Sequence, residues 1–115
     1  MYRIDKDDNI KLIKGDTMRM YLAVDNYQLS EGDKLYFTVK EDFGYTENAI
    51  QIVITEFSSG VAFIEITAEM SNSLPVGLYF YDVQIELKDG TVDTIKGPRM
   101  FKILREITSA NKTTE

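Results

Sequence analysis

The feature that most constrains this chain is a two-residue alternation of apolar and polar side chains between Gly77 and Leu87. One parity is apolar or aromatic throughout: Tyr79, Tyr81, Val83, Ile85 and Leu87. The other parity holds Phe80, Asp82, Gln84 and Glu86. Side chains of a strand point alternately to its two faces, whereas a helix repeats every 3.6 residues. The pattern therefore predicts a β-strand that buries one face and exposes the other.

The same alternation recurs along the chain between turn-forming residues. It predicts strands over residues 18–24, 35–40, 50–54, 62–67, 92–95 and 100–107, and a first edge strand over 10–13. Asp89-Gly90 predicts a tight hairpin turn, because glycine accepts a positive φ without steric cost. Gly97-Pro98 is expected to interrupt the pairing, since proline has no amide donor. Residues 68–74 do not alternate, and we expect them to form one helical turn that links two sheets.

Short strands separated by turns at regular intervals indicate a sandwich and not alternating strands and helices. We therefore predict an all-β fold, an immunoglobulin-like antiparallel β-sandwich of about seven to eight strands with one short helical turn. The domain is expected to span residues 1–108. Residues 109–115 have no apolar anchor and are expected to form a disordered C-terminal tail. Tyr79 stands where a tyrosine-corner residue would stand, with its hydroxyl returning to nearby backbone.

The composition leaves few groups for catalysis. The chain has no His and no Cys, which excludes imidazole and thiolate chemistry, zinc–thiolate sites and disulfides. Its acids fall in predicted turns or on the outward parity of strands, where solvated charges discourage pairing between sheet edges. We therefore predict that the protein is not an enzyme and has no cofactor. An enzyme that uses carboxylates stays open as the weakest alternative, and it would need a pocket with convergent acids.

One acidic segment resembles a calcium loop in its spacing. Asp5, Asp7 and Asn9 occupy the first, third and fifth positions of an EF-hand pattern. The sixth position, which needs glycine for a sharp turn, is Ile10, and the twelfth, which needs glutamate, is Asp16. We interpret the segment as a polar turn and predict no metal site.

Charge and hydropathy narrow the range of partners. Thirteen Lys and Arg against 19 Asp and Glu give a formal net charge of −6, which disfavours binding to a phosphate backbone, so we predict no nucleic-acid partner. No apolar run approaches the length of a membrane span, and the charged start of the chain is unlike a signal peptide. We therefore predict no membrane contact, and a protein kept inside the cell until assembly or lysis.

Aromatic and basic residues indicate a protein interface. Aromatic side chains that face outward either pack on their own subunit or anchor a partner. Residues 96–105 hold four cations and no acid, while the N-terminal stretch is acidic, which favours a solvated sheet edge or a head-to-tail subunit contact. The candidate interface consists of Phe43, Tyr45, Phe80, Lys96, Arg99, Lys102 and Arg105. A carbohydrate-binding or cell-surface adhesion module is the alternative, and it needs an exposed aromatic platform.

Several segments together carry a family resemblance: Ile13-Lys14-Gly15-Asp16-Thr17, Leu35-Tyr36-Phe37-Thr38-Val39-Lys40, Leu74-Pro75-Val76-Gly77-Leu78-Tyr79-Phe80-Tyr81-Asp82-Val83-Gln84, Lys88-Asp89-Gly90, Thr94-Ile95 and Phe101-Lys102-Ile103. From about residue 9 to Thr108 the chain resembles the small β-sandwich domains of phage and prophage tail or baseplate proteins of Gram-positive bacteria. It is similar to the N-terminal immunoglobulin-like part of upper-baseplate proteins.

The resemblance implies a structural virion component, or an adaptor that seats a receptor-binding protein on the tail, and it brings no catalytic residues with it. The implied partners are further copies of the chain and other tail proteins. We accordingly expect a homo-oligomer, located in the virion or in the host bacterial cytoplasm before assembly.

Overall fold

The long alternating segment forms β7 (Gly77–Glu86), a central strand of the larger of two sheets. The computed structural model describes residues 1–41 and 47–105. Besides β7, the elements within these residues are β1 (Tyr2–Ile4), β2 (Ile10–Ile13), β3 (Met18–Leu22), β4 (Lys34–Lys40), β5 (Ile50–Ile54), β6 (Ala62–Ile66), α1 (Ala68–Asn72) and β8 (Val92–Leu104). The predicted all-β fold is confirmed.

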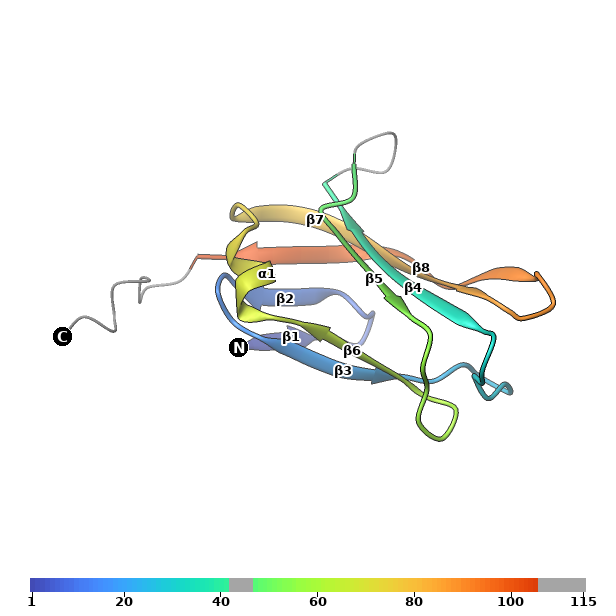
Figure 1. Cartoon of the computed structure of the whole chain (residues 1–115). Coiled ribbons are helices and arrows are strands. Elements are labelled where there is room, and N and C mark those ends of the chain that lie inside the picture. Colours follow the sequence, from blue (N-terminus) through green and yellow to red (C-terminus); the bar gives the residue numbers. More distant parts are fainter. Residues whose placement is uncertain (42–46, 106–115) are drawn as a thin grey trace.

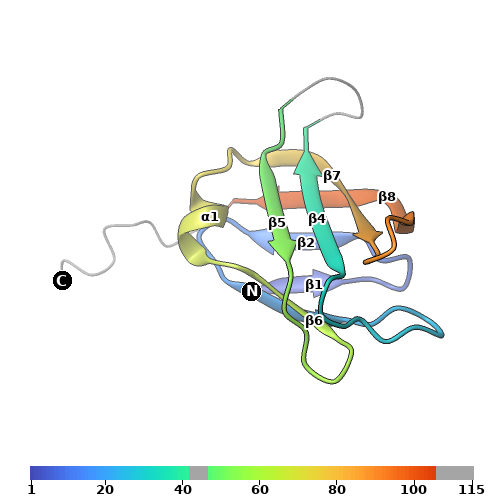
Figure 2. The ribbon, with the colours of Figure 1, turned by 45° about the vertical axis from the view of Figure 1, so that its right-hand side comes forward.

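The strands form two layers (Figures 1 and 2). In the part of the chain that the structure describes, the large sheet has the order β1-β2-β8-β7-β4-β5, and the small sheet pairs β3 with β6. Helix α1 lies at one end and leads from β6 of the small sheet to β7 of the large sheet (Figure 1). The predicted helical turn between the sheets is therefore confirmed.

Five strands are divided between the two sheets in the way that the corresponding strands of an immunoglobulin-like sandwich are. Such folds place their C, F and G strands in one sheet and their B and E strands in the other. Here β4, β7 and β8 take the first set of positions, and β3 and β6 take the second. The tyrosine corner is also present, because the hydroxyl of Tyr79 donates to the carbonyl oxygen of Pro75 at 2.8 Å.

Two details of the predicted pairing were wrong. The segment 10–13 is not an edge strand, since β2 pairs with β1 on one side and with β8 on the other. The pairing of β2 with β8 is parallel, so the large sheet is mixed and not purely antiparallel. The first difference arises because a short strand, β1, precedes β2 and folds back along it, and no alternation long enough to detect marks those three residues.

The expected interruption of pairing at Gly97-Pro98 is present, because the register passes from Arg99 opposite Tyr81 to Lys96 opposite Val83 and leaves both residues without a partner on β7. The chain nevertheless continues as one strand, β8, from Val92 to Leu104, where the sequence predicts two. The end of the predicted last strand, at 106–107, and the predicted tail 109–115 lie outside the described residues.

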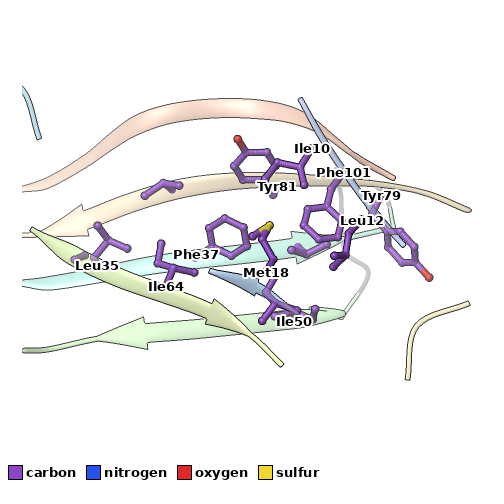
Figure 3. Close-up of a cluster of buried hydrophobic side chains, with 14 of the residues drawn as sticks. Ile10, Leu12, Met18, Leu35, Phe37, Ile50, Ile64, Tyr79, Tyr81 and Phe101 are labelled. Carbon is purple, nitrogen blue, oxygen red and sulfur yellow. The ribbon is translucent and has the colours of Figure 1, made fainter. Parts of the chain in front are cut away.

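Aromatic rings form the centre of the core between the two sheets (Figure 3). Phe37 of β4 stacks on Tyr81 of β7 with ring centroids 5.1 Å apart, and Phe101 of β8 meets Tyr81 edge-on at 6.3 Å. The small sheet contributes Met18 and Ile64, which are fully buried. The alternation therefore buries one face of β4, β6 and β7, as the sequence predicts.

Helix α1 is short and is anchored by polar contacts as well as by packing. The hydroxyl of Thr67 accepts a hydrogen bond from the amide of Met70 at 3.1 Å, which caps the N-terminus of the helix. Ser71 is buried, and its hydroxyl donates to the carbonyl oxygen of Asp16 at 2.7 Å. The Nζ of Lys14 donates to the carbonyl oxygen of Asn72 at 2.5 Å. These contacts fix the helix against the turn that precedes β3.

The tyrosine corner gives a test of the fold. Changing Tyr79 to Phe removes its hydrogen bond to Pro75 while keeping the buried ring, so we expect the free energy of unfolding to fall by about 1 kcal/mol. Urea denaturation measures this change. Tyr36→Phe is the matched control, because the hydroxyl of Tyr36 makes only a long contact of 3.2 Å to Glu86 on the partly exposed face. An equal loss in both variants would contradict a special role for the corner.

Candidate interaction surface

The outer face of the large sheet, turned away from the small sheet, is the surface on which candidate functional residues gather. Alternation places every second residue of β4 and β7 there. These side chains are partly buried, whereas their neighbours in sequence are buried in the core. The residues concerned are Tyr36, Thr38 and Lys40 of β4 and Phe80, Asp82, Gln84 and Glu86 of β7.

The middle of the outer face is hollowed. The hollow has a volume of about 480 Å³ and is open to solvent. It is lined by Thr38, Lys40, Asn48, Gln51, Phe80, Tyr81, Asp82, Gln84 and Pro98. Burial raises the pKa of Asp82, and the positive charge of Lys40 partly opposes that rise. Amide, hydroxyl and carboxyl groups around the ring of Phe80 can hydrogen-bond a polar ligand.

An apolar group lies beside the hollow, at the end of the outer face nearest to α1. Leu78 of β7 is 45% exposed, and Met100 and Leu104 of β8 are 37% and 38% exposed. Leu78 faces Lys102 in register, and Phe80 faces Met100. Neighbouring exposed apolar side chains that are bordered by polar ones are typical of a protein contact surface.

Three cations continue this surface across the sheet, and we call Arg3, Lys11 and Lys102 the cationic strip. Arg3 of β1 is directly opposite Lys11 of β2, and Lys11 is directly opposite Lys102 of β8. The ion pairs found in the described part of the chain involve none of these three residues. Their positive charges are therefore aligned across three neighbouring strands.

The candidate interface residues Lys96 and Arg99 have partners within the chain. The Nζ of Lys96 lies 2.8 Å from a carboxylate oxygen of Asp8, and the Nε of Arg99 donates to the carbonyl oxygen of Asp7 at 3.0 Å. Lys96 thus pairs with an N-terminal acid, and Arg99 with the backbone of the same turn, inside one molecule. The parallel pairing of β2 with β8 brings the 5–9 turn beside this part of β8.

Of the other five candidate interface residues, the structure describes three. Phe43 and Tyr45 lie outside the described residues. Phe80 is half-buried on the outer face, where it borders the hollow and faces Lys40 and Met100 in register. Lys102 belongs to the cationic strip, and Arg105 is exposed just after the end of β8. The structure therefore brings Phe80 and Lys102 to one face.

The segment with calcium-loop spacing forms the turn between β1 and β2. The carboxylate of Asp5 accepts hydrogen bonds from the amides of Asp7 at 2.8 Å and Asn9 at 2.9 Å. The bond from the amide of Asn9 is the main reason that the pKa of Asp5 is lowered. The residues that the structure describes contain no cluster of three potential metal ligands. The oxygens of Asp5 are occupied by the turn itself.

Comparisons with known proteins give no family for this chain. No family model matches the sequence, and no curated protein matches it significantly. Within residues 1–41 and 47–105, no helix is long and apolar enough to cross a membrane.

Sequence reasoning missed Arg3 and Lys11 as members of the site. The pattern Ile10-Lys11-Leu12 does put Lys11 on the face opposite the core. Nothing local indicates that β2 lies beside β8, which is about ninety residues further along the chain. The alignment of Lys11 with Lys102 depends on that long-range pairing.

Proposed function

We propose that this chain is a non-enzymatic assembly module of a phage or prophage tail or baseplate that works through protein contacts made by the outer face of its large sheet. The observation that supports it best is the exposure of Leu78, Met100 and Leu104 side by side at one end of that face. Exposed aliphatic side chains cost free energy in water, and a partner that covers them recovers part of it.

The tail or baseplate setting rests on the sequence resemblance. The module is proposed to act in the virion, or in the host bacterial cytoplasm before assembly, with other tail proteins and with copies of itself as partners. A tagged copy expressed during induction of a prophage that carries the gene tests this setting. We expect the tag to sediment with tail particles, and its exclusive recovery in the fraction of free protein would contradict the proposal.

Removing the apolar group tests the surface. Leu78→Ser with Met100→Ser is expected to lower the free energy of unfolding by only about 1–2 kcal/mol, because the two side chains are already 45% and 37% exposed. The same variant is expected to bind tail proteins with an affinity lower by about tenfold or more, as measured by co-purification and titration.

The control variant removes exposed aromatic side chains from the small sheet. Tyr21 and Phe63 are 71% and 41% exposed, and their ring centroids are 5.1 Å apart. Tyr21→Ser with Phe63→Ser is expected to keep the binding. Equal loss of binding in both variants would show that the outer face of the large sheet is not the contact surface.

A carbohydrate-binding or adhesion module is the second candidate, and the hollow is the observation that favours it. Asn48, Gln51 and Gln84 place amide groups around Phe80, a combination that suits the hydroxyls and the apolar face of a sugar. A glycan array with wild type and Gln84→Ala separates the two candidates. Glycan binding that is lost in the variant would favour this second function.

A further inference from the structure

The hairpin that joins β7 to β8 is acidic and projects from the sandwich. It lies at the end of the molecule opposite α1 (Figure 1). We call Glu86, Asp89 and Asp93 the acidic hairpin. Residues 88–94 are all exposed, and among them the aliphatic residue Val92 is 61% exposed. The hairpin therefore presents acids and an aliphatic side chain together.

The shape of the hairpin is fixed by its own contacts. The carboxylate of Asp89 accepts a hydrogen bond from the amide of Thr91 at 2.8 Å, and this bond is the main reason that its pKa is lowered. The amide of Lys88 donates to the buried carboxylate of Asp33 at 2.9 Å, which attaches the hairpin base to the loop before β4. The acids are thus held at a rigid tip.

The cationic strip lies at the other end of the molecule, and the repulsion between its charges destabilises the large sheet. Like charges directly opposite each other on neighbouring strands destabilise a sheet, and here two such pairs share Lys11. Asp5 is the acid whose charge interacts with Lys11, but its oxygens accept the hydrogen bonds of the 5–9 turn. An anionic group placed over the strip would relieve the repulsion. The neighbouring Leu78 and Met100 favour a protein over a phosphate backbone as its source.

The strip and the hairpin of one molecule cannot meet. Leu78, which faces Lys102, precedes Glu86 by eight residues of the extended strand β7, a separation of roughly 26 Å at about 3.3 Å per residue. That distance exceeds the range of about 10 Å over which exposed charges interact at about 0.1 M salt. The two complementary surfaces are therefore available only to different copies.

We propose that copies of this chain associate head to tail, with the acidic hairpin of one copy seated on the cationic strip and apolar group of the next. The interface is heterologous, so repetition produces a ring or a filament and not a closed two-fold dimer. Val92 of the hairpin contacts the apolar group, and the acids face the strip. This inference rests on the proposed function, since it names the partner and the contact of an assembly module.

Concentration and salt test the association in the wild-type protein. By light scattering, we expect the average mass to rise above the 13.2 kDa of one chain with increasing concentration at about 0.1 M salt. It should fall back toward one chain at about 1 M salt, where charges are screened within about 3 Å. A single-chain mass at every concentration in dilute salt would overturn the inference, as would growth that stops at two chains.

Two neutralised variants test the surfaces. The strip variant is Lys11→Gln with Lys102→Gln, and the hairpin variant is Asp89→Ser with Asp93→Asn, where serine keeps a hydroxyl that can accept the turn hydrogen bond. Each variant alone is expected to associate at least about tenfold more weakly than wild type. Mixed together they should form a one-to-one pair and nothing larger, because only one intact strip and one intact hairpin remain in each pair.

A control and a swap complete the test. Lys6→Gln with Arg19→Gln removes the same charge from exposed positions outside the strip and the hairpin, and this variant is expected to associate as wild type does. A chain that carries both Lys102→Glu and Asp93→Lys should regain association.

Association that survives in the strip variant would overturn this inference and leave the proposed function standing on another surface. Loss of binding to tail proteins in the Leu78 and Met100 variant is a separate readout, which tests the proposed function alone.

Discussion

Replacing Phe37 with alanine is expected to lower the free energy of unfolding by about 3–5 kcal/mol. Phe37 is fully buried at the centre of β4 and stacks on Tyr81, so the substitution removes apolar contact and leaves a cavity between the two sheets. Domains of this size are stable by only about 5–15 kcal/mol, so the variant should lie close to its unfolding threshold. Urea denaturation followed by circular dichroism measures the change.

Phe63→Ala is the matched control for that experiment. Phe63 is also a phenylalanine in a strand, but it is 41% exposed on the outside of the small sheet. We expect its replacement to cost about 1 kcal/mol, mainly the contact with the ring of Tyr21. Similar losses in the two variants would contradict a core centred on Phe37.

Replacing Asp33 with asparagine is expected to destabilise the fold by about 3 kcal/mol at neutral pH. Asp33 is buried, and its carboxylate accepts hydrogen bonds from the Tyr27 hydroxyl at 2.8 Å, the Ser30 amide at 2.9 Å and the Lys88 amide at 2.9 Å. Asparagine has one acceptor oxygen in place of two, so at least one buried donor would lose its partner. Asp25→Asn, an exposed carboxylate in the same connection between β3 and β4, is the control, with an expected change below about 0.5 kcal/mol.

The stabilisation that the Asp33 carboxylate provides depends on pH, and the direction of that dependence follows from its pKa. Burial by itself raises the pKa of this carboxyl, but the hydrogen bonds from Ser30, Tyr27 and Lys88 outweigh it, and the pKa is lowered. A lowered pKa in the folded state stabilises the protein above the pKa of the unfolded chain, which is about 3.9 for aspartate. That contribution is lost as the pH falls through the lower, folded value.

The difference in unfolding free energy between wild type and Asp33→Asn should therefore be constant from about pH 7 to about pH 5 and shrink below about pH 4. Urea denaturation of both proteins across this range measures it. A difference that grows on acidification would mean that the buried group is already protonated in the native state.

Asp33 also links stability to the proposed assembly. Its bond to the amide of Lys88 holds the base of the acidic hairpin, whose acids are proposed to seat on the next copy. Asp33→Asn is thus expected to loosen the hairpin as well as the core, although it changes no charge at the hairpin tip. The neutralised hairpin variant, which leaves Asp33 in place, separates the two effects.

Most of the fold could be predicted from local sequence. The alternation in β7, β4 and β6 indicates both the strands and the face that each one buries, because side-chain direction in a strand repeats every two residues whatever the strand pairs with. Tyr79 was likewise identified as a corner residue from its place at the start of a strand, and its bond to Pro75 follows from contacts only four residues apart.

The candidate surface depended on the tertiary structure. Lys102 was a candidate from the sequence, but Arg3 and Lys11 joined it only through the parallel pairing of β2 with β8. The same pairing gives Lys96 and Arg99, two of the candidate interface residues, partners in the 5–9 turn. The local two-residue period determines which face of the sheet a side chain occupies. The residues that lie opposite it on the next strand depend on how the whole core packs, and a short stretch of sequence does not determine that packing.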